Sequence, residues 1–181
     1  GTSAVTPTLC LGSSNGIASA TMNTGGTAPY TYLWDAAAGN QATQFATGLA
    51  LGNYVGTVTD TYGCTVTVSA AITSPAAMVI TATPADPQCL GGSSGSATTS
   101  VVSGGTPGYV YAWSNGSALQ TATGIAAGVY SVTITDVNNC VGSTSITLNE
   151  PTAVNPSIVG NNVSCFGAND GDIDITTIGG E

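Results

Sequence analysis

The feature that most constrains this chain is an internal repeat. The stretch that begins at Cys10 begins again at Cys89 and at Cys165, after 79 and then 76 residues. Two longer stretches keep the same spacing, since residues 25–34 recur at 104–113 and residues 52–60 recur at 128–136. Each copy of such a repeat is one structural unit that stacks on its neighbours. A module copied in tandem usually supplies length, spacing or multivalency rather than one catalytic centre.

The repeat also predicts the domain organisation. We expect two complete units over residues 1–75 and 76–151, and the start of a third over 152–181. Because the third copy stops early, we expect the chain to be a segment of a longer mature protein. The linkers at 75–77 and 151–153 are short, so neighbouring units are expected to abut as a semi-rigid rod.

Composition excludes several classes of function. The 181 residues include no Lys, Arg or His, against nine acidic residues, and 5% of residues are charged where about 25% is usual. No cationic side chain can neutralise a phosphate, which excludes nucleic-acid binding, and an anionic membrane would repel the chain. Without imidazole or amine side chains no nucleophile–base pair can be assembled, so we expect no enzyme.

The apolar pattern predicts an all-β fold. In residues 128–136, Tyr130 alternates with polar residues, as do the valine and isoleucine that follow it, and period-two alternation is typical of strands. The aromatic residues of 30–34 share one face in the same way. Six or seven short strands in about 76 residues favour tandem immunoglobulin-like β-sandwiches. Trp34 and Trp113, each expected on a central strand, are predicted to fill the cores, and Tyr54 and Tyr130 to form tyrosine corners.

The five cysteines follow the phase of the repeat. We expect one disulfide to close each sandwich, Cys10–Cys64 in the first and Cys89–Cys140 in the second, with the partner of Cys165 beyond residue 181. Each bridge would stabilise its module by roughly 4 kcal/mol in the chain-entropy model, and disulfides imply an oxidising, extracytoplasmic compartment. Free buried thiols are the alternative. Zinc is disfavoured, because the chain has neither CxxC spacing nor His.

At this point the sequence resembles a known family, the SprB repeat. The resemblance is carried by Cys10-Leu11-Gly12, by Asn15-Gly16, by residues 25–34 and 49–60, and by Gly63-Cys64, and it covers most of the chain. Copy two departs only in its turns, at residues 106–109 and at Asn139. The family occurs in very large surface adhesins of gliding Bacteroidetes. The resemblance therefore implies type IX secretion, exposure on the cell surface and a role in adhesion or motility, and it transfers no catalytic residue.

One cluster of carboxylates has the spacing of calcium ligands. Asp170, Asp172 and Asp174 alternate like the start of a calcium loop, but the distal Gly and Glu of an EF-hand are absent. A solvated strand face is the favoured interpretation and calcium the alternative, with no other cofactor expected. Asp60 and Asp136 each follow a strand and precede a turn, where an Asp normally caps its own backbone.

These observations lead to one functional hypothesis and one alternative. We expect a structural repeat segment of a secreted adhesin or extracellular filament, which serves as a stalk or spacer for adhesion or gliding. Self-association with neighbouring repeats or chains is expected, because few ions must be desolvated and the strand edges lack Lys. The alternative is a surface module that binds calcium or a polysaccharide, the latter by stacking on Tyr30, Tyr32 and Trp34; these aromatic residues are more simply explained as core.

Overall fold

The computed structural model describes residues 1–180, which form fourteen β-strands and one short 3-10 helix, with no α-helix in this range. Contacts between Cα atoms divide the chain into two compact units. The first comprises Gly1–Ile80, Val101–Val110 and Ile134–Gly142, and the second comprises the remainder. Because these units cut across the second copy, the expected boundaries at residues 75 and 151 stay a prediction.

The first copy consists of two antiparallel three-stranded sheets. One has the order β1-β2-β4 and the other β3-β5-β6. The strands are β1 (Thr2–Thr6), β2 (Gly16–Thr21), β3 (Thr31–Trp34), β4 (Phe45–Leu49), β5 (Gly52–Thr59) and β6 (Thr65–Ile72), with helix η1 (Ala36–Ala38) between β3 and β4. This is the order of strands A-B-E and C-F-G in an immunoglobulin constant domain, which confirms the predicted fold class.

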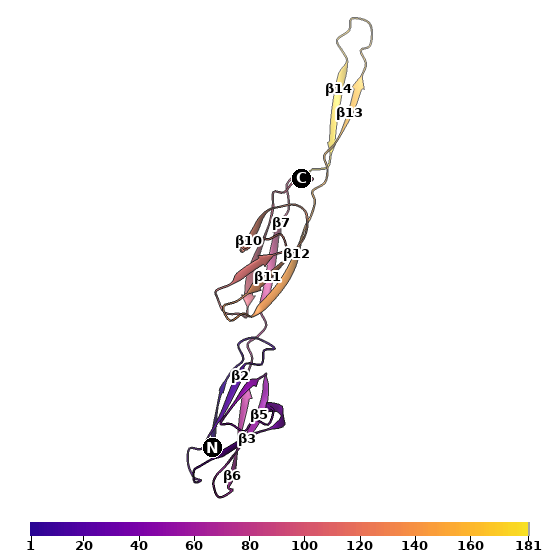
Figure 1. Cartoon of the computed structure of the whole chain (residues 1–181). Coiled ribbons are helices and arrows are strands. Elements are labelled where there is room, and N and C mark those ends of the chain that lie inside the picture. The colour runs from indigo at the N-terminus through magenta and orange to yellow at the C-terminus, as the bar shows by residue number, and fades with distance from the viewer. Residues whose placement is uncertain (181) are drawn as a thin grey trace. The chain divides into compact units, whose positions relative to one another are not determined.

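The second copy repeats this strand order. Its sheets are β10-β8-β7 and β12-β11-β9. The strands are β7 (Val79–Ala85), β8 (Gly95–Ser103), β9 (Val110–Trp113), β10 (Thr121–Ile125), β11 (Gly128–Thr135) and β12 (Val141–Leu148). A last pair, β13 (Asn155–Asn161) and β14 (Asp172–Ile178), forms an antiparallel hairpin in which Ile158 lies opposite Ile175 (Figure 1).

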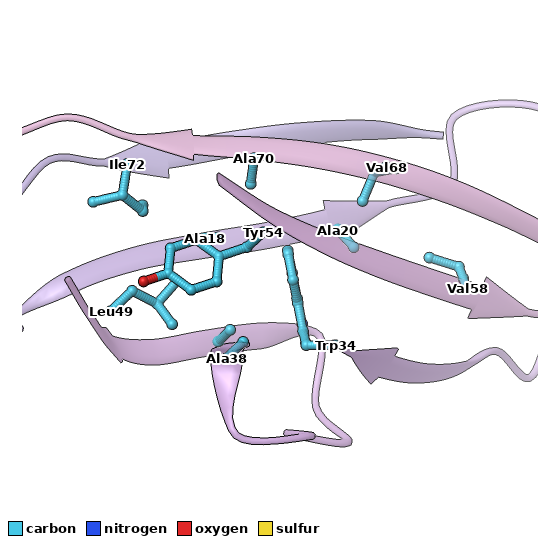
Figure 2. Close-up of a cluster of buried hydrophobic side chains, with 11 residues drawn as sticks. Ala18, Ala20, Trp34, Ala38, Leu49, Tyr54, Val58, Val68, Ala70 and Ile72 are labelled. Carbon is cyan, nitrogen blue, oxygen red and sulfur yellow. The ribbon is translucent and has the colours of Figure 1, made fainter. Parts of the chain in front are cut away.

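The core of the first copy lies between its two sheets. Trp34 is 1% exposed and Tyr54 is 6% exposed, and Figure 2 shows both rings among the side chains of β2, β5 and β6. Gly56 makes room for the indole, since a Cβ there would lie 3.2 Å from two carbons of the Trp34 ring. Strand β3 is at the edge of its sheet, so the expectation of a central strand for Trp34 is wrong. The tryptophan fills the core nevertheless, because β3 faces the opposite sheet.

The polar atoms of these aromatic side chains find backbone partners in both copies. The Tyr54 hydroxyl donates to the carbonyl of Ala50 at 3.0 Å, and the Tyr130 hydroxyl donates to the carbonyl of Ala126 at 3.1 Å. The indole Nε1 of Trp34 donates to Thr43 O at 3.0 Å, and that of Trp113 donates to a carbonyl in the same way. The two tyrosine corners and the two tryptophan cores predicted from the sequence are therefore confirmed.

The expected disulfides are wrong. Cys10 lies in the loop between β1 and β2, at the end of the sandwich where β6 finishes, and Cys64 lies in the β5–β6 turn at the opposite end. Strand β5 has eight residues, which places the two ends roughly 26 Å apart. A disulfide needs Cα atoms within about 7 Å of each other. The pairing Cys10–Cys64 is therefore excluded within one sandwich.

The observed disulfide joins different copies of the repeat. Cys10 bonds to Cys140, with sulfurs 2.08 Å apart and Cα atoms 5.3 Å apart, and both residues belong to the first contact unit. The expected pair Cys89–Cys140 is thereby excluded as well. Among the described residues, the free thiols are those of Cys64, Cys89 and Cys165, and all three are exposed. That the partner of Cys165 lies outside the chain stays a prediction.

Candidate functional site

The candidate site is the junction around the Cys10–Cys140 disulfide. It is assembled from two kinds of loop that recur along the chain. The first-cysteine loops are residues 9–15, 88–94 and 164–170, which connect the first two strands of each copy. The second-cysteine loops are residues 60–64 and 136–140, which connect the last two strands.

The first-cysteine loops share one local structure in all three copies. In each, the residue before the cysteine donates its backbone N–H to a side-chain oxygen six positions later. The donor–acceptor pairs are Leu9 N to Asn15 Oδ1, Gln88 N to Ser94 Oγ and Ser164 N to Asp170 Oδ1, each at 3.0 Å. In each loop the cysteine carbonyl also accepts a nearby backbone N–H, at 2.9 to 3.1 Å. Three different side chains thus hold the same loop.

The second-cysteine loops are organised by one aspartate each. Asp60 Oδ1 accepts the N–H groups of Tyr62 and Cys64, both at 2.9 Å, and its Oδ2 accepts that of Thr27 at 3.1 Å. Asp136 repeats this set with the N–H groups of Asn138, Cys140 and Thr106, each at 2.8 Å. The prediction that these aspartates cap turns is confirmed.

Asn139 takes the place of Gly63 in the second copy, and the backbone conformation at this position stays the same. Gly63 has φ 81° and Asn139, its counterpart, has φ 63°. Asn is the non-glycine residue that best tolerates this left-handed conformation. The substitution that departs from the family pattern therefore preserves the turn.

The hydrogen bonds shift the titration of both aspartates. The N–H of Cys64 is the main cause that lowers the pKa of Asp60, and those of Thr27 and Tyr62 add to it against the opposing effect of burial. Burial raises the pKa of Asp136, but the N–H groups of Thr106, Cys140 and Asn138 together outweigh it, so this pKa also lies below its ordinary value. Both loops therefore favour the ionised carboxylate.

Around the disulfide, the first unit contains a hollow of about 290 Å³. It is lined by the first-cysteine loop, the linker that follows β6, the Gly-Gly-Thr turn and the second-cysteine loop. Its lining residues are Leu9, Cys10, Leu11, Pro75, Ala76, Ala77, Met78, Gly104, Gly105, Thr106, Asp136, Cys140 and Val141. Gly104 has φ 70°, and a Cβ there would lie 2.3 Å from the carbonyl oxygen of Ala77. Only glycine fits this approach of linker to turn.

Within the second unit, the equivalent residues line a second hollow of about 300 Å³. Gln88, Cys89 and Leu90 take the places of Leu9, Cys10 and Leu11, and residues 151–154 take those of 75–78. A Cβ at Gly179, which has φ 88°, would meet the carbonyl oxygen of Ala153, as one at Gly104 would meet that of Ala77. The second-cysteine loop has no counterpart in this lining.

The proposed metal ligands lie apart from these loops or are already engaged. The pKa of Asp170 is lowered by the hydroxyl and the N–H of Ser164, so this carboxylate holds its own loop. Asp172 and Asp174 are exposed on β14, opposite Asn161 and Val159. Across residues 1–180, no three His, Cys, Asp or Glu side chains gather as a metal site would require. The arrangement agrees with a solvated strand face.

Sequence reasoning missed the junction itself. The pairing of Cys10 with Cys140, the linker at 75–78 and the role of Gly104 were not anticipated. A signal was present, because pairing the first cysteine of one copy with the second cysteine of the next also keeps the phase of the repeat. Sequence alone cannot choose between such connectivities.

Comparison with known proteins identifies the repeat. The family model of the SprB repeat matches this chain at two sites, residues 2–39 and 81–118. The resemblance to the SprB repeat noted in the sequence is therefore confirmed over these residues. The matches end close to β3 and β9, so the second-cysteine loops lie outside them. No curated protein matches the chain.

Two solved structures are similar to this chain at low identity. Murine CEACAM1b shares 13% identity and has a TM-score of 0.32, with 77% of this chain and 94% of that chain covered. The amphioxus IgVJ-C2 molecule shares 13% identity and has a TM-score of 0.31, with 82% of this chain and 96% of that one covered. The immunoglobulin-like topology is established by the strand order of the two sheets and does not depend on these likenesses.

In the described part of the chain, no helix has the length and apolar character needed to span a membrane.

Proposed function

We propose that this chain is a structural segment of a cell-surface adhesin, in which it serves as a spacer for adhesion or gliding motility. SprB repeats belong to cell-surface proteins, and the family model matches the chain at two sites. The observation that most favours a structural role is the Cys10–Cys140 bond, which joins one copy of the repeat covalently to the next. A spacer needs this continuity between modules, whereas a binding module needs an open, specific site.

The chemistry of the surface supports the same function. With 5% charged residues and no cation, contacts between copies desolvate few ions. Tyr30 and Tyr32 pack against the core cluster that contains Trp34, so the aromatic face is committed to the interior of the sandwich. Export by the type IX route and assembly into a filament belong to this proposal as further expectations.

Labelling of intact cells tests the proposal. Fab fragments raised against residues 1–151 are expected to bind unpermeabilised cells that express the native protein. A spacer predicts that saturating Fab leaves adhesion to a glycan-coated surface unchanged within about twofold, because the binding tip lies elsewhere. Absence of surface labelling would contradict the proposed location, and loss of adhesion at saturation would contradict the spacer role.

The alternative function, a glycan- or calcium-binding module, is tested in solution. The spacer hypothesis predicts no saturable binding on a glycan array and no change in the melting temperature with millimolar calcium. A shift of several degrees with calcium, abolished in Asp172→Asn together with Asp174→Asn, would favour the alternative. The variant Asp35→Asn, which removes a carboxylate from the first unit, serves as the control for the calcium-dependent shift.

A further inference from the structure

We propose that the pairing of Cys10 with Cys140 is one link of a disulfide ladder. In this ladder the first cysteine of each copy bonds to the second cysteine of the next copy. Cys89 then bonds to the second cysteine of a copy that follows, and Cys64 bonds to the first cysteine of a copy that precedes. The partner of both thiols is another copy of this repeat. The inference extends the proposed spacer function, but its test is independent of that function.

The first line of support is that Cys89 is presented as Cys10 is. Both loops are closed by an N–H donated to a side-chain oxygen at 3.0 Å, and both cysteine carbonyls accept a backbone N–H three residues on, from Ser13 in one loop and Gly92 in the other. Cys89 is exposed and unpaired, whereas Cys10 is bonded. Because the local geometry is shared, Cys89 differs from Cys10 in lacking a partner loop.

The second line of support is that Cys64 is presented as Cys140 is. Asp60 and Asp136 each accept the N–H of their loop cysteine and of the threonine in the Gly-Gly-Thr turn. The backbone N–H of each aspartate also donates to the carbonyl of that cysteine, at 3.0 and 2.9 Å. The loop that delivers Cys140 to Cys10 is therefore preformed around the exposed thiol of Cys64.

The third line of support is the surface around each thiol. The hollow beside Cys89 is lined by the same first-cysteine loop and linker positions as the hollow beside Cys10, and by Gly180 of its glycine turn, but by no second-cysteine loop. At the other end of the first copy, the turn at Gly25 has φ 76°, close to the 70° of Gly104. A Cβ at Gly104 would meet the carbonyl of Ala77, whereas one at Gly25 would meet no atom within 4 Å. The surface at Cys89 thus lacks a second-cysteine loop, and the glycine turn beside Cys64 lacks a linker.

Each disulfide of the ladder forms by thiol–disulfide exchange. The two thiols form one S–S bond and lose two electrons and two protons. A donor disulfide takes these up and is reduced to two thiols. An oxidising, extracytoplasmic compartment supplies such donors. No further co-reactant is needed.

The decisive experiment adds one copy of the repeat to this chain. A variant with a second copy of residues 76–151 inserted after Pro151 contains seven cysteines in place of five. After folding with oxidised glutathione, the ladder predicts two disulfides: Cys10–Cys140, and Cys89 with the second cysteine of the inserted copy. The number of thiols that react with an alkylating reagent then stays at three, as in the parent chain. Five alkylated thiols, or a bond between Cys89 and Cys140, would overturn the inference.

The control and a measurement on the native protein complete the test. In the extended chain, Cys89→Ser in the first of the two copies should raise the alkylated thiols from three to four, because it leaves the inserted second cysteine unpaired. Native protein alkylated before extraction and digested with pepsin, since trypsin finds no Lys or Arg, should yield Cys64 and Cys89 only in peptides cross-linked to other copies. Alkylated Cys64 and Cys89 would overturn the ladder even if the insertion variant fails to fold. Surface labelling by Fab is unaffected by either result.

Discussion

The two second-cysteine loops have nearly the same structure and different surroundings. Asp60 is half-buried beside an exposed Cys64, whereas Asp136 is 4% exposed beside a Cys140 that is bonded to Cys10. The hydrogen bonds that the two aspartate side chains accept correspond one to one. The second-cysteine loop is therefore a local structure that is complete without the junction, and the junction adds burial and a covalent bond to it.

The largest expected effect follows from removing that covalent bond. The disulfide closes a loop with a sequence separation of 130 residues, which corresponds to about 5 kcal/mol in the chain-entropy model. Cys10→Ser should lower the urea midpoint measured by tryptophan fluorescence, whereas Cys64→Ser should leave it unchanged. Equal midpoints for the two variants would show that the two loops do not differ in the way described.

The same bond should limit how far the chain extends under force. When the chain is pulled by its ends, the residues between Cys10 and Cys140 are bypassed by the disulfide. Reduction should therefore release roughly 450 Å of additional contour length, at about 3.5 Å per residue over a separation of 130. Single-molecule force spectroscopy with and without reductant measures this increment. Full extension without reductant would contradict the pairing.

A smaller effect is expected from the glycines of the two Gly-Gly-Thr turns. Gly104→Ala should cost about 2–4 kcal/mol, because the positive φ is strained and the new Cβ meets the carbonyl of Ala77. Gly25→Ala should cost about 1 kcal/mol, from the positive φ alone. Chemical denaturation of both variants gives the comparison, and a Gly25→Ala cost equal to that of Gly104→Ala would refute the contact.

Asp60 and Asp136 should make the stability of the folded protein depend on pH. Because the pKa of Asp60 and that of Asp136 are lower in the folded protein than in the unfolded chain, their contribution is present above about pH 4, the unfolded value. It is lost as the pH falls through the folded pKa values. The melting temperature should drop below pH 4, and this drop should be smaller in Asp136→Asn. Asp172→Asn, which removes an exposed carboxylate from β14, is the control and should keep the parental profile.

The smallest effect is expected at the tyrosine corners. Tyr54→Phe should cost about 1 kcal/mol, the usual net contribution of one hydrogen bond, because the hydroxyl bonds Ala50 O beside a buried ring. Tyr130→Phe should cost less, since its hydroxyl is in a more exposed setting where water can replace it. Urea titration followed by circular dichroism separates the two, and a larger loss for Tyr130→Phe would reverse the comparison.

Much of each sandwich was predictable because its determinants are local. Alternation of apolar and polar residues located β5, β6, β11 and β12, since one face of each strand packs on the core. Strands β1 and β4 were not located individually. All five residues of β1 are exposed, and the buried positions of β4 do not alternate, so neither carries a period-two signal.

The repeated all-strand module, with its tryptophan core, tyrosine corner and aspartate-capped turn, could be predicted from the sequence alone. Each of these depends on residues close together in one copy and on the alternation of side chains along a strand. The pairing of the cysteines, by contrast, depends on the tertiary structure. Within one sandwich an eight-residue strand separates the two cysteine loops, and their approach between copies depends on contacts among the linker, the glycine turn and the loop. The bond itself joins residues 130 positions apart, and no local pattern in the chain records it.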